Sequence, residues 1–309
     1  MKCLICTKGV LEKYSKIDGT DFYECNSCKS LHVDPDFLAG DFLKTKNYGE
    51  SYWEFECLSS KERSYGSSIA RTGEVFLYAR KKSNRFIDVG TGPGYLLDSL
   101  STLLPNIKNI FHDVELFPPP KKFRSKHVNY HIGTLNDINL KFDAGTCIEV
   151  IEHLAPDQLE SLIAQLAKRS NPGALYYFNS AQPSFVKVND PGYLDPHVRG
   201  HIFSYSLDAL SPIFTKYGFS LIPMPGRDWG FLVEYAIDIN EHFDFHSLMN
   251  RVWNALPENV ENIKNNLFGN FVYTSAIEAS RCYYEAEMSN QRASMVLPLQ
   301  KKFSWWRKP

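Results

Sequence analysis

The sequence lacks several features that would restrict where the protein works. No apolar run approaches twenty residues, so no segment is long enough to span a bilayer as a helix. Basic and acidic residues nearly balance, at 34 against 35, so no general field would draw in nucleic acid or an acidic membrane surface. The first ten residues, MKCLICTKGV, lack the apolar core of a signal peptide, and we therefore expect a cytoplasmic protein.

Cysteine is also scarce, and seven cysteines in 309 residues do not suggest a disulfide scaffold. Four of them form two pairs, Cys3-x-x-Cys6 and Cys25-x-x-Cys28, which are separated by 18 residues. Two such knuckles supply four thiolates for a tetrahedral zinc site, and a filled site leaves no position for a catalytic water. We therefore expect a structural zinc ribbon. The alternatives are four ordinary small residues or a redox pair.

The most informative feature of the chain is a glycine-rich turn. Residues 85–98 read RFIDVGTGPGYLLD, which predicts a short strand that turns sharply into a helix around Gly90, Gly92 and Gly94. Glycine permits backbone angles that a Cβ would forbid and lets a ligand touch the main chain. The unpaired N–H groups at the start of the helix suit a polar or anionic ligand. A dinucleotide fingerprint would need glycine at the sixth position, where Tyr95 stands.

At this turn the chain resembles the class I S-adenosylmethionine-dependent methyltransferases, whose first motif reads acid-x-Gly-x-Gly-x-Gly. Asp88, Gly90, Gly92 and Gly94 match that motif. A second apolar strand, roughly residues 109–115, ends in an acid, which in the family binds the ribose hydroxyls. Asp113 and Glu115 point to one face of that strand, because side chains alternate. Glu115 lies nearer the carboxyl end, where ligands bind in open α/β sheets, and we expect it to be the ribose ligand.

Further motifs in the family's order extend the resemblance over about residues 60–225. Residues 133–138 resemble the segment that flanks the adenine, with Thr134 where the family usually has an acid. Residues 142–154 match the fourth strand and the loop after it, and residues 171–175 match the turn into the fifth. The resemblance implies S-adenosylmethionine as the cofactor, bound by Asp88, Gly90, Thr91, Gly92, Gly94, Glu115, Thr134, Leu135 and Glu149.

In similar methyltransferases the segment before the first strand covers the methionine end of the cofactor. The candidates for that role are Tyr48, Tyr52, Trp53 and Arg71, although aromatic packing explains the first three equally well.

A cluster of acids and histidines could carry the chemistry. Glu149, Glu152 and His153 follow the fourth strand, and His201 comes 48 residues after His153. Methyltransferases of the ubiquinone-biosynthesis type carry a similar E-x-x-E-H followed by a later histidine. The small-RNA 3′-end ribose methyltransferases show the same order and bind a divalent ion with it. The resemblance thus implies an ion at Glu149, Glu152, His153 and His201, and two carboxylates with two imidazoles suit Mn²⁺, Fe²⁺ or Co²⁺, with Mg²⁺ a further candidate.

Two other interpretations of this cluster remain open. His153 alone could be a metal-free general base, since its ordinary pKa lies near neutrality, with Glu152 and His201 around it. All four side chains could instead be structural, and His197 or Asp195 could replace His201 in any role.

The pattern of the whole chain predicts an α/β fold. Residues 86–223 alternate strand and helix, which indicates a Rossmann-like, doubly wound and mostly parallel sheet. We divide the chain into a zinc ribbon (residues 1–33), a linker or lid with N-terminal helices (34–84), a methyltransferase core (85–239) and a helical C-terminal extension (240–309). Residues 34–60 are predicted to be irregular and 61–82 to be helical. The extension is expected to form a cap or an oligomer contact.

We therefore predict an S-adenosylmethionine-dependent methyltransferase that transfers a methyl group in line to an oxygen of a small polar metabolite. A sugar or a nucleotide-linked sugar is the expected acceptor, because ribbon-plus-methyltransferase chains resemble certain deoxysugar methyltransferases. One alternative is an RNA methyltransferase, although the neutral charge argues against a surface that tracks phosphates. The other is a non-catalytic interaction protein on a methyltransferase fold.

Overall fold

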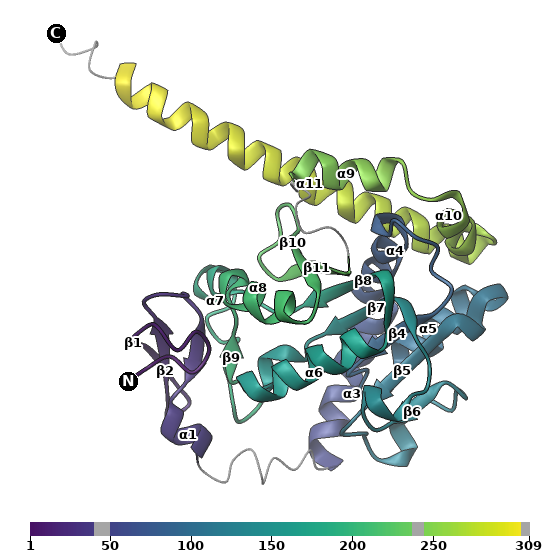
Figure 1. The fold of residues 1–309 in the computed structure, drawn as a ribbon, viewed down its shortest axis with the longest axis horizontal. Helices are drawn as coiled ribbons and strands as arrows, with labels where there is room; N and C mark the ends of the chain where they lie inside the picture. The colour runs from purple at the N-terminus through teal and green to yellow at the C-terminus, as the bar shows by residue number, and fades with distance from the viewer. Residues whose placement is uncertain (40–49, 237–243, 304–309) are drawn as a thin grey trace.

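The structure, a computed structural model, describes residues 1–39, 50–236 and 244–303 (Figure 1). Its centre is a sheet of seven strands in the order β10-β11-β8-β7-β4-β5-β6. These strands are β4 (Phe86–Val89), β5 (Phe111–Glu115), β6 (Tyr130–Ile132), β7 (Phe142–Ile148), β8 (Ser170–Asn179), β10 (Phe219–Pro223) and β11 (Gly230–Tyr235). All neighbouring strands from β8 to β6 are parallel, and β11 pairs antiparallel with both β8 and β10. The predicted doubly wound, mostly parallel sheet is confirmed.

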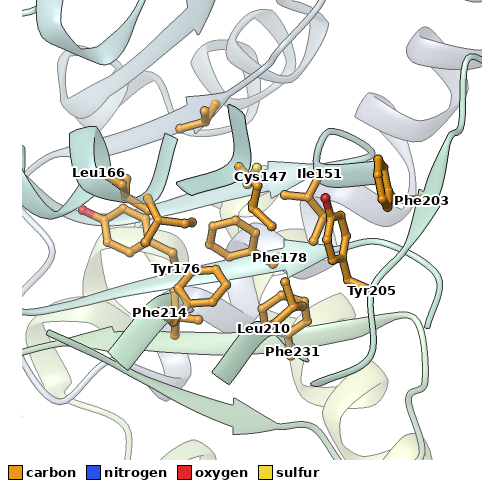
Figure 2. Packing of buried hydrophobic residues seen from close by; sticks show 14 of the residues in the cluster. Cys147, Ile151, Leu166, Tyr176, Phe178, Phe203, Tyr205, Leu210, Phe214 and Phe231 are labelled. Carbon is orange, nitrogen blue, oxygen red and sulfur yellow. The ribbon is translucent and has the colours of Figure 1, made fainter. Parts of the chain in front are cut away.

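Helices cover both faces of this sheet, because side chains alternate along each buried strand. In β8, Tyr176 and Phe178 join one core with α6 (Pro156–Lys168) and α8 (Leu207–Lys216). Figure 2 shows the aromatic part of that core around Phe178, with Cys147 beside it. Leu175 and Tyr177 of the same strand join a second core. Its helices are α4 (Ser67–Tyr78), α5 (Tyr95–Leu103), α9 (Phe245–Trp253), α10 (Pro257–Lys264) and α11 (Leu267–Phe303). The predicted helical C-terminal extension is thus confirmed, and α11 projects away from the body of the molecule (Figure 1).

A second, smaller sheet holds the N-terminal cysteines. Its order is β1 (Leu11–Ile17), β2 (Thr20–Cys25), β3 (Leu31–Val33) and β9 (Phe203–Ser204), with every neighbouring pair antiparallel. Strand β9 belongs to the segment between β8 and α8, so a segment that follows the large sheet's strand β8 completes the N-terminal sheet. This pairing joins residues about 170 positions apart and had no signal in the sequence.

The prediction that residues 34–60 are irregular was wrong for the part that the structure describes. Residues 35–39 form α1 (Pro35–Ala39), and α3 (Glu50–Tyr65) is a long helix. Trp53, Cys57 and Ser60 are all buried, at a spacing of i, i+4, i+7. That spacing places them on one face of a helix, which decides the local structure despite the aromatic composition. The predicted helix over residues 61–82 is interrupted at Gly66 and ends at Tyr78.

Short elements complete the chain between these helices and strands. They are α7 (Pro183–Val188) and the 3-10 turns η1 (Pro105–Ile110), η2 (Lys121–Phe123), η3 (Leu135–Asp137) and η4 (Ile151–His153). Among the helices described, none combines the length and the apolar character that a membrane crossing requires.

Candidate active site

The glycine turn connects β4, an inner strand of the large sheet, to α5. Its three glycines all have positive φ angles, 72° at Gly90, 60° at Gly92 and 83° at Gly94, which side chains disfavour. A Cβ on Gly90 would lie 2.5 Å from Val150, whereas the space beside Gly92 is open as far as the ring of Trp53, 3.8 Å away. The backbone at Gly92 is therefore the part of the turn that a ligand can approach, and Trp53 of α3 covers it.

The acid at the end of β5 faces this turn. The carboxylate of Glu115 accepts the N–H of Gly92 at 2.6 Å and the N–H of Phe117 at 2.7 Å. Asp113 instead accepts the hydroxyl of Thr91 at 2.8 Å. Glu115 thus reaches the backbone that a ligand would touch, while Asp113 holds a side chain of the turn. Burial raises the pKa of Glu115, and of Asp113 to a greater extent.

Asp88 lies beneath the turn. Its carboxylate is buried and accepts the hydroxyl of Thr146 at 2.6 Å. Burial raises the pKa of Asp88 to about 7, against hydrogen bonds that lower it. Asp88 therefore supports the turn from below and presents little surface to a ligand.

The segment expected to flank the adenine follows β6. The hydroxyl of Thr134 donates to the carboxylate of Asp137 at 2.8 Å, which closes a capping box over η3. The side chain of Leu135 is buried in the core, and its carbonyl accepts from Arg169 at 3.0 Å. Leu135 can thus offer a ligand only its backbone. Tyr48 and the side chain of Tyr52 lie outside the described residues.

The loop after β7 holds the predicted acids and His153. Glu149 has a positive φ of 56° and its carboxylate accepts from the side-chain amide of Asn179. Glu152 is fully buried, and one of its oxygens accepts the hydroxyl of Tyr193 at 2.7 Å. Its other oxygen, Oε2, has no hydrogen-bond partner within the described part of the chain. Burial, and then the nearby charge of Glu149, raise the pKa of Glu152 well above its ordinary value.

The two predicted histidines meet at this buried acid. The rings of His153 and His201 lie edge to face with centroids 4.7 Å apart. Nδ1 of His153 lies 3.0 Å from the carbonyl of Gly200, and Nδ1 of His201 lies 2.9 Å from the carbonyl of Tyr193. A carbonyl only accepts, so each Nδ1 donates and the neutral ring carries its lone pair on Nε2. Metal-ligating histidines are oriented in the same way.

Ligand atoms of Glu152, His153 and His201 all lie within 4.8 Å of one another, and Nε2 of His201 is 3.8 Å from Glu152. Two imidazoles and one carboxylate are a donor set for Fe²⁺ and related ions. The structure thus brings three of the four predicted ligands together. Glu149 lies beside Glu152 but outside this group, because Asn179 holds its carboxylate.

The four N-terminal cysteines also converge. The sulfurs of Cys3 and Cys28 are 3.8 Å apart, and those of Cys6 and Cys25 are 3.6 Å apart. Four sulfurs at about 2.3 Å from a central zinc would lie about 3.8 Å from one another. Backbone N–H groups of Ile5, Gly9 and Cys28 donate to three of these sulfurs at 3.4 Å. The residues present therefore fit a zinc ion.

A cavity of about 480 Å³ opens beside the carboxyl end of the sheet, and no sequence motif indicated it. Its wall includes Glu149 and Asn179, which lie at the ends of β7 and β8. Helix α4 contributes Arg71 and Glu74, and the loop before β9 contributes Tyr193. The remaining lining residues are Ser67, Ala70, Ala181, Phe185, Asp190, Arg199, Arg227, Trp229, Ala279 and Tyr283. Glu152 lies directly behind this wall, because the Tyr193 hydroxyl joins the two.

A model of the methyltransferase domain matches residues 61–224, which is more than half of the chain. No curated protein sequence matches it. Among solved structures, it is similar to CalS10, an amino pentose methyltransferase from Micromonospora echinaspora, at 16% identity and a TM-score of 0.45, over 59% of this chain and 95% of that one. It is also similar to DesVI of Streptomyces venezuelae, at 14% identity and a TM-score of 0.45, over 60% and 98% of the two chains.

A third similar structure is the sugar N-methyltransferase KedS8 from Streptoalloteichus, at 13% identity and a TM-score of 0.44, over 56% of this chain and 88% of that one. The match of the domain model covers the glycine turn, Glu115 and the loop after β7, which the fold places along one edge of the sheet. This chain belongs to the methyltransferase-domain family.

Proposed function

We propose that this methyltransferase transfers the methyl group of S-adenosylmethionine to an oxygen of a small polar metabolite, such as a sugar or a nucleotide-linked sugar. The observation that carries the proposal is the cavity beside the carboxyl end of the sheet. It is large enough for a small metabolite, and it is lined by amide, carboxylate and guanidinium groups that can bind hydroxyls.

The residues of the turn suit the cofactor. The backbone of Gly92 and the carboxylate of Glu115 offer a donor and an acceptor to the ribose, and Thr134 and Leu135 follow on the adenine side. Trp53 covers the turn and must shift or pack against a bound cofactor, since it lies in the space beside Gly92. Bound S-adenosylmethionine supplies an activated methyl group. The protein then has to align the acceptor oxygen with it and remove a proton.

The loop residues suit removal of that proton. In this proposal Glu152, His153 and His201, with Glu149 beside them, hold a divalent cation next to the cavity wall. Such an ion lowers the pKa of a hydroxyl when bound. Nδ1 of each histidine donates to a carbonyl, which fixes the ring and leaves Nε2 as the basic nitrogen. Glu149 lines the cavity and is the carboxylate placed to accept a hydrogen bond from the acceptor.

Three measurements test the proposal. Calorimetry with S-adenosylhomocysteine should detect binding, and a protein that does not bind it is not an enzyme of this kind. A panel of sugars and nucleotide-linked sugars should include one that promotes release of S-adenosylhomocysteine, whereas turnover with RNA alone would refute the small acceptor. Mn²⁺ titration should find one site besides the cysteine cluster.

Glu152→Gln should weaken that Mn²⁺ site by roughly tenfold or more, the scale of a lost charged ligand. Glu160→Gln, on the exposed side of α6, makes the same change of charge and should leave Mn²⁺ affinity unaltered. Equal Mn²⁺ affinity in the wild type, Glu152→Gln and Glu160→Gln would refute a cation site at Glu152 and favour His153 as a metal-free base. In that case a chelator that leaves the cysteine-bound zinc in place would not slow turnover.

A further inference from the structure

Two of the three arginines on the cavity wall pair with carboxylates, and the third has no such partner among the described residues. Arg227 forms a two-pronged ion pair with Glu74, at 2.6 and 2.8 Å, and both side chains are buried. Arg199 pairs with Asp190 at 2.7 Å. Arg71 lines the same cavity, but its Nε and Nη1 atoms are buried without a hydrogen-bond partner among the described residues.

An unmatched guanidinium in such a place is costly. Arginine stays charged at any physiological pH, and the two buried nitrogens of half-buried Arg71 lose water without gaining an acceptor among the described residues. Arg227 lies close by, since both guanidinium carbons lie over the ring of Trp229, at 5.0 Å for Arg71 and 5.6 Å for Arg227, but Glu74 balances its charge. Glu74 serves Arg227 and also accepts the hydroxyl of Ser280 at 2.6 Å. The cavity thus has a site where a negative group would be stabilised.

The shape of this site favours an oxyanion. A guanidinium presents its donors in a planar fork that matches the paired oxygens of a carboxylate or phosphate. The guanidinium of Arg71 packs against the ring of Trp229, and α4 carries its stem. A bound oxyanion would therefore meet donors that are already oriented, which reduces the entropy lost on binding.

The cavity that Arg71 lines meets the proposed cofactor site at Glu149, and Arg71 itself was a candidate for covering the methionine end of the cofactor. The residues lining the cavity include neither the glycines of the turn nor Glu115. They do include Glu149, which follows β7, and Trp229, which precedes β11. The guanidinium of Arg71 and the carboxylate of Glu149 therefore border the same cavity, away from the glycine turn and Glu115.

We propose that Arg71 and Trp229 form a subsite for a negatively charged group of the methyl acceptor, so that the acceptor is an acidic metabolite carrying a carboxylate or a phosphate. This inference rests on the proposed function, because it concerns the acceptor of the same cavity. The charged group binds Arg71, and the hydroxyl that receives the methyl group lies toward Glu149. A neutral sugar of the same size would leave Arg71 unmatched and would bind more weakly.

The test uses the full chain saturated with S-adenosylhomocysteine, so that the cofactor site is filled. Inorganic phosphate, glucuronate and neutral glucose are titrated separately by calorimetry. We expect phosphate or glucuronate to bind at least tenfold more tightly than glucose, and the stronger of the two identifies the group. Arg71→Gln should weaken that binding at least tenfold. Arg281→Gln removes the same charge on the exposed face of α11 and should leave it unchanged.

The affinity for S-adenosylhomocysteine distinguishes a failure of this proposal from a failure of the proposed function. It should be the same in the wild type and in Arg71→Gln. A loss confined to S-adenosylhomocysteine would place Arg71 at the methionine carboxylate of the cofactor and overturn the subsite. Equal affinity for the two anions and glucose, or equal anion affinity in Arg71→Gln and the wild type, would also overturn it. Failure of the wild type to bind S-adenosylhomocysteine would instead refute the proposed function.

Discussion

Removing one ligand from the cysteine cluster should loosen the loop that carries His201, although the two are far apart in the sequence. Strand β9 begins two residues after His201 and pairs with β3, which follows Cys28. The N–H of Ile202 in turn donates to the carbonyl of Glu152 at 2.9 Å. The N-terminal sheet therefore braces the backbone on which the proposed ligands sit.

The structure sets the scale of this effect. Besides the β3–β9 ladder and the contact between the Ser30 and Ser206 hydroxyls, four hydrogen bonds join the two segments, namely Val33 N–H to Ile202 O, Ser206 N–H to Ser30 Oγ, the Ser206 hydroxyl to Cys28 O, and Thr20 with His197. At about 1 kcal/mol each they contribute about 4 kcal/mol. Because every 1.4 kcal/mol is about tenfold, losing them would make local opening roughly 10³-fold more frequent.

Cys25→Ser is the perturbation, since zinc binding and folding of such a unit are coupled. Hydrogen exchange should show the amide of Ile202 exchanging up to roughly 10³-fold faster than in the wild type. Cys282→Ser, at an exposed cysteine of α11, is the matched control and should change nothing. Binding of S-adenosylhomocysteine should persist, because the glycine turn lies on the large sheet. If the amide of Ile202 stays protected while the amides of β1 and β2 exchange freely, the N-terminal sheet does not stabilise the loop that carries His201.

Two further outcomes are expected at the cofactor turn. Glu115→Ala should weaken S-adenosylhomocysteine binding by roughly tenfold or more, the scale of a lost charge-assisted hydrogen bond. If calorimetry finds this loss only in Asp113→Ala, then Asp113 and not Glu115 is the ribose ligand. Asp88→Asn should make the unliganded protein less sensitive to pH. Because burial raises the folded-state pKa of Asp88 to about 7, from an ordinary value of 3.8, its contribution to stability is fully present below about pH 4 and is lost as the pH rises through 7. Urea unfolding should therefore show Asp88→Asn gaining stability relative to the wild type between pH 5.5 and 8, and a constant difference would contradict this.

The sequence by itself determined the features that depend on neighbouring residues. The three glycines of the turn, the apolar strands before and after it, and the doubled cysteine pairs are all local patterns. Their spacing follows from backbone geometry, so the doubly wound sheet and the methyltransferase resemblance could be predicted. The helix α3 is also a local feature, because Trp53, Cys57 and Ser60 recur at helical spacing, but the aromatic composition of residues 34–60 favoured an irregular segment.

Only the tertiary structure decided which distant side chains meet. Glu74 pairs with Arg227 across 153 positions, and Cys28 meets Ser206 across 178, with no spacing rule that could have indicated either contact. Sequence reasoning grouped Glu149 with Glu152, His153 and His201, but the fold turns Glu149 toward Asn179 and the cavity. Local patterns fix the elements because backbone geometry is the same in every protein. The contents of a cavity depend instead on how whole elements pack, and that is settled only when the complete chain has folded.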